Sequence, residues 1–393
     1  MLKENIVHYC RKVLEKSRSF IARNVGKRRF DFFLLIVVLV VFAIAISGHS
    51  RIPALVFKHT NITISQSGER LLGKDVIDAF IKEFENQNPE MRVHVASETQ
   101  PDIIFFDENE ISSLLANSTL ALLEPSTHRT FHTEQWAVPL VRFTDFFLYN
   151  VDILQAANQD RPPRTRAEVL TAARAVAEET AAFPFALGLS QADPLALRQE
   201  LYPWVWAAGE DLRPASAEGA ELSSEMMEAI AFFVQLNGEG LLSPGSFEAT
   251  RAQRLQEFSK GTIAMMSISS RDLAFLQSNA TNVNFGITAV PQITQRQVRL
   301  GLTGIYAGIS SASLVPEEAQ IFLTFLAERK HALEEMTGAV SHNMLNNLAT
   351  QDPLYAKVLS IFESAEIVEY SPADPLEIET SRVVRQRLEE VLQ

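Results

Sequence analysis

The sequence that decides the fold reads Pro101-Asp102-Ile103-Ile104-Phe105-Phe106-Asp107-Glu108-Asn109, an apolar run that ends abruptly in three polar side chains. Upstream lie an alternating segment at 62–65, a stretch at 76–84 whose apolar positions share one helix face, and a second alternating segment at 92–95. A strand, a helix, a strand and a buried apolar run, joined by short connections, predict a βαβ-type unit. The chain is therefore expected to form an α/β fold around a mostly parallel sheet.

Polar side chains follow two neighbouring strands of this predicted sheet. Ligands of such sheets bind beyond the carboxyl ends of the strands, and two of those ends converge here beside one aromatic ring. The sequence therefore predicts a small-molecule pocket, with candidate contacts at Ser65, Gln66, Ser67, Glu69, Phe106, Asp107, Glu108 and Asn109.

The N-terminal segment carries a membrane or export signal. Residues 32–46 read FFLLIVVLVVFAIAI, and nine Lys and Arg stand against three Asp and Glu in residues 1–48. By the positive-inside rule, the N-terminus stays in the cytoplasm and the remainder is exported. We expect a cytoplasmic basic segment at 1–30, a transmembrane anchor or signal segment at 31–48, and a tether at 49–60.

The sequence leaves two alternatives for that segment, a cleaved signal and an uncleaved anchor. Fifteen residues span roughly 23 Å, short of a bilayer core of about 30 Å, and small residues at 43–47 suit a signal peptidase. The long charged region before the run instead favours an uncleaved anchor. The anchored form is a single-pass protein of the inner (cytoplasmic) membrane with its binding domain in the periplasm.

The charge and the cysteine count limit the partners of the exported part. Cys10, the sole cysteine, precedes the apolar run, so the exported part has no disulfide. The chain carries a net charge of −13, and residues 49–393 alone carry −19. Such an acidic body argues against nucleic acid or an anionic membrane surface as its partner.

The length of 393 residues favours two or three domains. We expect a first lobe at 61–150 plus about 291–340, and a second lobe at 151–290 plus about 341–393. Trp204 shares a helix face with Leu197 and Leu201, which predicts a core position. From residue 316 onward the pattern predicts helices only.

Four segments carry a family resemblance. They are Pro101–Phe105, the run Leu148-Tyr149-Asn150-Val151-Asp152, and the pair Lys260–Met266 and Asn284–Pro291. In their order and spacing over about 61–372 they resemble the extracellular solute-binding proteins of ABC transporters, of the sugar-binding, maltose-binding-like class. The resemblance implies a two-lobe, periplasmic-binding-protein-like fold with a hinge, preceded here by the N-terminal transmembrane helix.

The same resemblance implies a function without covalent chemistry or a cofactor. The protein would capture a small solute, carbohydrate in the first instance, and deliver it to ABC permease subunits, tethered to the membrane through its N-terminal segment. Carried over by position, further ligand contacts would be Phe143, Thr144, Gln191, Asp193, Ser269, Ser270, Arg271, Tyr306 and Tyr370.

One departure from the family leaves the ligand class open. Where relatives often carry a sugar-stacking tryptophan, this chain has Ser269-Ser270-Arg271. An arginine can clamp a carboxylate or phosphate through two parallel hydrogen bonds. An acidic or phosphorylated solute therefore stays as an alternative to a neutral sugar.

Other functions find less support. Asp107, Glu108 and Glu110 crowd one strand end, whereas glycoside hydrolysis needs two carboxyl groups on opposite sides of the scissile bond, so no enzyme is expected. His128 and His132 are spaced for one helix face and could bind zinc, but no third ligand is identified. A membrane-tethered sensor or scaffold that kept the fold without transport is the main alternative.

Overall fold

The computed structural model describes residues 59–96, 100–123, 136–193, 196–208, 222–293, 297–369 and 386–390. Residues 59–393 form one compact unit. The predicted cytoplasmic segment and transmembrane helix, and nearly all of the tether, lie outside the described residues. Within the described ranges, no helix combines the length and apolar character needed to cross a bilayer.

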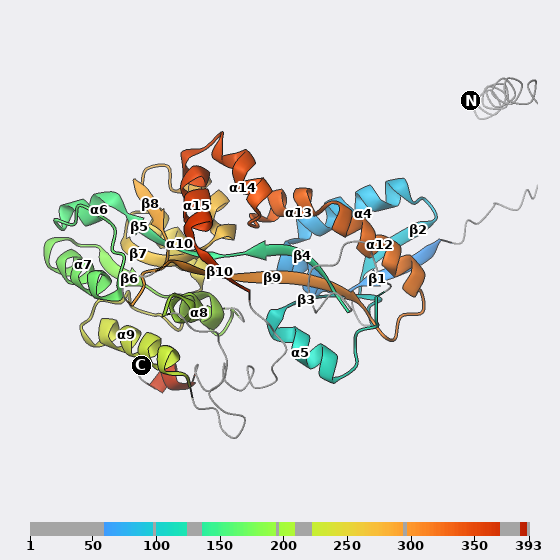
Figure 1. Ribbon diagram of the computed structural model, residues 1–393, viewed down its shortest axis with the longest axis horizontal. Coiled ribbons are helices and arrows are strands. Elements are labelled where there is room, and N and C mark those ends of the chain that lie inside the picture. The colour runs from blue at the N-terminus through green and yellow to red at the C-terminus, as the bar shows by residue number, and fades with distance from the viewer. Residues whose placement is uncertain are drawn as a thin grey trace, which may run out of the picture. The chain divides into compact units, whose positions relative to one another are not determined.

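The first sheet has the strand order β10-β9-β3-β1-β2, with β4 paired to β9 (Figure 1). Strand β1 runs parallel to β2 and β3, which confirms the predicted parallel unit. Strand β9 is antiparallel to β3 and β4 and parallel to β10. The strand bounds are β1 Thr60–Ile64, β2 Met91–Val95, β3 Ile103–Asp107, β4 Val138–Phe143, β9 Arg299–Ile309 and β10 Glu366–Glu369.

Helices cover both faces of this sheet (Figure 1). The predicted helix is α4, which buries Val76, Ile77, Phe80 and Phe84 because these positions share one face. The ring of Phe84 meets Phe322 and Phe325 edge-on, with centroids 4.8 and 5.2 Å away. The helix bounds are α3 Ser67–Leu72, α4 Lys74–Gln87, α5 Glu108–Ala116, α12 Pro316–Glu328 and α13 Lys330–Thr337.

The second sheet has the order β6-β7-β5-β8 and is mixed, since β6 is parallel to β7 while β5 is antiparallel to both neighbours. Its strands are β5 Asp145–Asn150, β6 Phe183–Ala186, β7 Ile263–Ser269 and β8 Phe285–Thr288. Its helices are α6 Val151–Ala156, α7 Arg166–Glu179, α8 Ala196–Ala208, α9 Ser224–Gly238, α10 Arg251–Ser259, the 3₁₀ turn η2 Ser270–Asp272, α11 Leu273–Asn279, α14 His342–Ala349 and α15 Pro353–Ser364.

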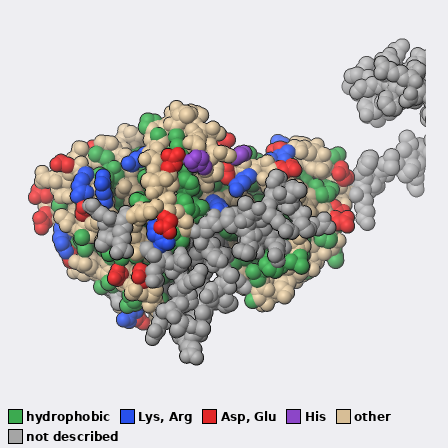
Figure 2. Space-filling view, in the orientation of Figure 1, with side chains coloured by type: hydrophobic (Ala, Val, Ile, Leu, Met, Phe, Trp, Pro, Cys, Tyr) green, Lys and Arg blue, Asp and Glu red, His purple; other side chains and the backbone are tan. Residues whose placement is uncertain are grey.

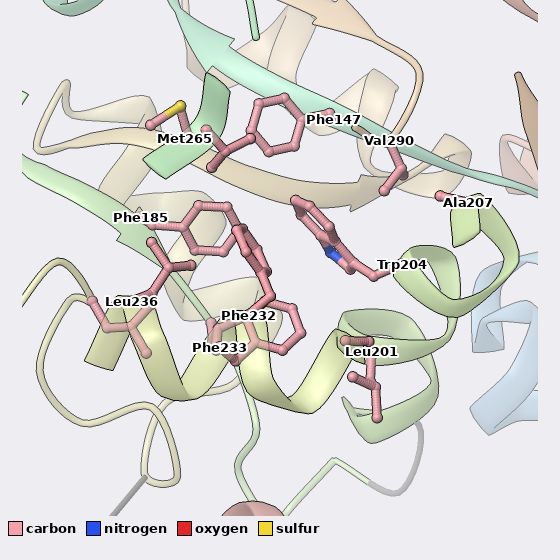
Figure 3. Close-up of a cluster of buried hydrophobic side chains, with 14 of the residues drawn as sticks. Phe147, Phe185, Leu201, Trp204, Ala207, Phe232, Phe233, Leu236, Met265 and Val290 are labelled. Atoms are coloured by element: carbon pink, nitrogen blue, oxygen red, sulfur yellow. The ribbon is translucent and has the colours of Figure 1, made fainter. Parts of the chain in front are cut away.

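Trp204 confirms its predicted place in the core of the second sheet (Figure 3). Its ring stacks on Phe232 at 4.9 Å and meets Phe147 and Phe185 edge-on, each at 5.9 Å. Its indole N–H donates to the hydroxyl of Ser267 at 3.1 Å, so its buried polar group is satisfied. This aromatic cluster anchors α8 on the sheet.

Within the described residues, the chain passes between the cores of the two sheets at three places. Phe143 packs in the first core and Phe146 in the second; on β9 the order is reversed, with Leu300 in the second core and Ile305 in the first. The third passage lies between Ala339 and Val340, directly after α13. We call the parts on either side the first-sheet half and the second-sheet half.

One expectation is corrected by this fold. The prediction of helices alone after residue 316 is wrong, because β10 adds a parallel strand to β9. Glu366-Ile367-Val368-Glu369 alternates polar and apolar residues, which suits a strand. Strand β5 lies in the second sheet, so the first passage comes at Thr144, before the predicted lobe boundary at 150. Sheet membership is not a domain division, and the lobe boundaries stay predictions.

The surface carries both signs of charge. On the face in Figure 2, acidic and basic side chains lie scattered among polar and apolar ones over the described residues. The acidity of the chain is thus spread over this face rather than gathered in one patch.

Candidate functional site

A pocket lies where the passages between the two sheets begin. Together with the open solvent at its mouth, it covers about 410 Å³ that no protein atom fills. Its walls come from the ends of β3 and β4, the start of β5, the end of β7 and the middle of β9, together with α3, α8 and η2. The lining residues are Leu71, Asp107, Phe143, Asp145, Gln199, Ser269, Arg271, Thr303 and Gly304.

The passages beside the pocket are tied to one another by hydrogen bonds. The Thr144 hydroxyl donates to the Gly301 carbonyl at 3.0 Å, and the Ser270 N–H donates to the Thr144 carbonyl at 2.9 Å. The Val340 N–H donates to the Arg142 carbonyl at 2.7 Å. Hydrogen bonds therefore join all three passages to one another next to the pocket.

Arg271 reaches across the pocket from the second-sheet half. Its guanidinium carbon lies 3.6 Å from the ring centroid of Phe143, and its Nη1 donates to the Leu71 carbonyl at 3.1 Å. Phe143 and Leu71 both belong to the first core. The guanidinium thus forms a wall of the pocket while it is bonded within the protein.

A buried ionic cluster underlies the second-sheet side of the pocket. Arg251, on the first turn of α10, lies 3.4 Å from Asp145 Oδ1 and 3.3 Å from Asp272 Oδ2. Its Nε lies 4.0 Å from Glu200 Oε1, on α8. The guanidinium of Arg251 therefore lies within ion-pair distance of three carboxyl groups. One of them, Asp145, also lines the pocket.

Glu200 has the weakest polar contacts of the residues in this cluster. Its side chain is 1% exposed, and neither carboxyl oxygen has a hydrogen-bond partner among the described residues. The pKa of this carboxyl is raised to about 8, mainly by burial; Arg251 acts to lower this pKa, and the charges of Asp145, Asp272 and Asp193 act to raise it. This raised pKa favours the protonated form of Glu200, which carries no negative charge beneath the pocket.

Four of the predicted contacts line the pocket: Asp107, Phe143, Ser269 and Arg271. Asp107 ends β3, as the apolar run predicted, and is 4% exposed. Thr144 and Ser270 lie beside the pocket and are buried, where they join the two halves through their backbone groups.

The predicted ligand contacts at residues 65–69 do not line the pocket, and the two serines among them bond to the backbone instead. The Ser65 hydroxyl accepts from the Phe105 N–H at 2.9 Å, and the Ser67 hydroxyl donates to the Phe105 carbonyl at 2.5 Å. These hydroxyls satisfy β3 itself. Gln66 is exposed, and Glu69 pairs with Lys74 at 2.9 Å on the surface.

Other predicted contacts also lie outside the pocket lining. The ring of Phe106 is buried and stacks on Tyr306 at 5.9 Å, in a small cluster with Ile111. Gln191 is exposed and donates to Glu389 at 3.2 Å. Asp193 acts on Glu200 through its charge. The side chains of Glu108 and Asn109, and all of Tyr370, His128 and His132, lie outside the described residues.

Sequence reasoning missed five lining residues: Leu71, Asp145, Gln199, Thr303 and Gly304. A polar residue directly after Thr144 was a usable signal for Asp145, because that position begins a strand of the second sheet. Gln199 lies within α8, and Thr303 and Gly304 lie inside β9, so no strand end marks them.

The described residues hold no group of three His, Cys, Asp or Glu side chains suited to a metal ion. The pocket instead combines carboxylates, an amide, hydroxyls and a guanidinium with two apolar side chains. A concave site of this kind, between two α/β halves, is typical of small-molecule binding proteins.

Residues 78–332 match the family of bacterial extracellular solute-binding proteins, and the chain belongs to this family. The family is a class of binding proteins, not of enzymes. Membership confirms the resemblance seen in the sequence.

Solved structures share the fold. The GacH receptor of Streptomyces glaucescens, solved unliganded and with acarbose, is 17% identical with a TM-score of 0.65, over 85% of this chain and 93% of that one. The cyclic α-maltosyl-1,6-maltose binding protein of Arthrobacter globiformis is 19% identical with a TM-score of 0.62, over 85% and 94%.

An ABC transporter solute-binding protein of Thermotoga lettingae, bound with α-D-tagatose, is 17% identical with a TM-score of 0.65, over 85% and 94%. At these identities the similarity defines the periplasmic-binding-protein-like α/β fold. Among curated proteins, none matches the chain.

Proposed function

We propose that this protein is the extracytoplasmic receptor of an ABC transporter and captures a small sugar-like solute in the pocket between its two halves. The observation that carries the proposal is the mixed lining of that pocket. Asp107 comes from the first sheet, Asp145 and Ser269 come from the second, and Thr303 comes from β9, a strand of the first sheet whose residues pack in the cores of both halves.

These groups match the chemistry of a polyhydroxylated solute. Carboxylate oxygens accept hydrogen bonds from sugar hydroxyls, while the Gln199 amide and the serine and threonine hydroxyls both donate and accept. Leu71 contributes an apolar surface for C–H groups. Related folds bind acarbose and α-D-tagatose, which supports a sugar-like ligand for this chain as well.

Capture would work through closure of the two lobes about the passages at Thr144, Gly301–Thr303 and Ala339–Val340. A solute shifts the equilibrium between open and closed forms only by its difference in affinity for the two. Contacts from both halves supply that difference, because the open form keeps only part of them. A permease would then recognise the closed form.

Membrane tethering through residues 1–48 belongs to the same proposal. Its support is the fifteen-residue apolar run behind the triplet Lys27-Arg28-Arg29. In this arrangement the pocket faces the periplasm and the permease lies in the same membrane.

The proposal is tested by thermal unfolding of the full chain, purified in a detergent without a sugar head group. The probes are maltose, tagatose, glucuronate, glucose 6-phosphate and Zn²⁺. A ligand at 100 times its Kd adds about 2.7 kcal/mol to the free energy of unfolding. We expect a rise in the unfolding temperature with a neutral sugar and its loss in Asp107→Asn.

Asp160→Asn is the matched control, because Asp160 is an exposed aspartate outside the pocket lining. It should keep the sugar response of the wild type. A response to the sugar acid or phosphate alone would change the ligand class, and a response to Zn²⁺ alone would favour metal binding. No response to any probe would favour the tethered sensor or scaffold.

A further inference from the structure

Arg271 is held in place by its backbone at the junction of the two halves. It lies in η2, directly after β7, where the preceding Ser270 N–H donates to the Thr144 carbonyl at 2.9 Å. Gly338, which ends α13 with a φ of +68°, packs against the Arg271 backbone so closely that a Cβ would lie 3.2 Å from the Arg271 Cα. The backbone at Arg271 is therefore held in place beside two of the passages.

From this point the side chain crosses to the first-sheet half. Its guanidinium lies over the face of Phe143, and its Nη1 donates to the Leu71 carbonyl in the last turn of α3. The last four carbonyls of a helix lack partners within the helix, so this oxygen is a natural acceptor. One side chain of the second-sheet half thus makes a stacked and a hydrogen-bonded contact with the first-sheet half.

We propose that Arg271 is a positioning residue that holds the two halves together in the ligand-free protein. The proposal does not depend on the class of solute. It also gives Arg271 a use other than the anion clamp suggested by the sequence, since a carboxylate or phosphate would have to compete with Phe143 and Leu71 for the guanidinium.

Arginine suits this task better than lysine. A planar guanidinium stacks on an aromatic face and still directs its N–H groups sideways, whereas an ammonium is a compact, strongly hydrated charge. Removal of the stack and of a hydrogen bond from a charged donor should reduce the ratio of closed to open molecules about tenfold or more.

The test measures the distance between the halves by double electron–electron resonance on the full chain without added solute. Cys10 is the sole cysteine, so a Cys10→Ser background allows spin labels at Lys82→Cys on α4 and Glu178→Cys on α7. Both side chains are exposed, and they lie in different halves. We expect one narrow distance distribution for this background and an added population at longer distance after Arg271→Ala.

Arg329→Ala is the matched control. The Arg329 guanidinium lies 3.8 Å from the ring centroid of Phe325 and pairs with Glu83 at 2.6 Å, but all three residues belong to the first-sheet half. It removes the same kind of stack and should leave the distribution unchanged. Arg271→Lys, which keeps the charge without the stack, should give an intermediate population.

Two results would overturn the proposal. One is the same distribution for Arg271→Ala and its background. The other is a broad, long-distance distribution already present in the background. Far-UV circular dichroism shows whether each variant is folded, and Arg271→Lys decides the matter if Arg271→Ala is not. Since no solute is added, neither outcome depends on the proposed transport function.

Discussion

Replacement of Glu200 by glutamine should make the stability of this protein less dependent on pH. Burial raises the pKa of the Glu200 carboxyl from its ordinary value of 4.5 to about 8 in the folded chain. Between these values the folded protein holds a proton that the unfolded chain releases. The free energy of unfolding therefore falls as the pH rises from about 4.5 to about 8.

The size of this effect on the free energy of unfolding follows from the difference between the two pKa values. One pKa unit is worth about 1.4 kcal/mol, so keeping Glu200 protonated at pH 7 costs about 3 kcal/mol. Glutamine is neutral at every pH and avoids this cost, although its amide also lacks partners at a site where Glu200 has none among the described residues. We expect Glu200→Gln to be more stable than the wild type by about 1–3 kcal/mol at pH 7, with little difference at pH 4.5.

Urea unfolding at pH 4.5, 6, 7 and 8 measures this difference through the fluorescence of the buried Trp204 and Trp206. Glu168→Gln is the control. Its partly exposed carboxyl pairs with Arg161 at 2.7 Å, which holds its pKa at about 2, so its contribution is present throughout this pH range. A stability difference for Glu200→Gln that stays constant with pH, or that falls as the pH rises, would refute the reasoning.

Two further variants test the fold around the site. Thr165→Ala removes the hydroxyl that caps α7 by accepting from the Glu168 N–H at 3.2 Å, so it should lower the free energy of unfolding by about 1 kcal/mol in urea titration. Gly301→Ala places a Cβ into the ring of Trp206 at the β9 passage, so we expect a loss of about 1–3 kcal/mol or more and a change in Trp fluorescence. An equally stable Gly301→Ala variant would show that α8 is free to move away from β9.

Local patterns predicted much of the fold. The apolar run at 103–107 and the helix face of Val76 and Phe84 both lie in the structure where the sequence placed them. Each depends on neighbours within a few residues, because periodicity records which side of an element is buried. The family resemblance likewise followed from segments that keep their order along the chain.

The local polar pattern was a weaker guide to the site. Ser65 and Ser67 follow a strand end, as pocket residues do, yet their hydroxyls bond to the backbone of β3. A strand end shows that a polar side chain is near an edge of the sheet. It does not show which donors and acceptors the neighbouring strand has already engaged.

The sequence by itself determined most of the elements, with β10 as an exception, many of their buried faces and the family to which the chain belongs. Only the tertiary structure decided which polar groups meet, since Asp107, Asp145, Gln199 and Thr303 are brought together by three passages between two sheets. The same long-range packing seats Arg271 on Phe143 and leaves Glu200 to share one guanidinium with two aspartates. Burial, charge and hydrogen bonding at such a site depend on partners tens to hundreds of residues away, and local periodicity carries no record of them.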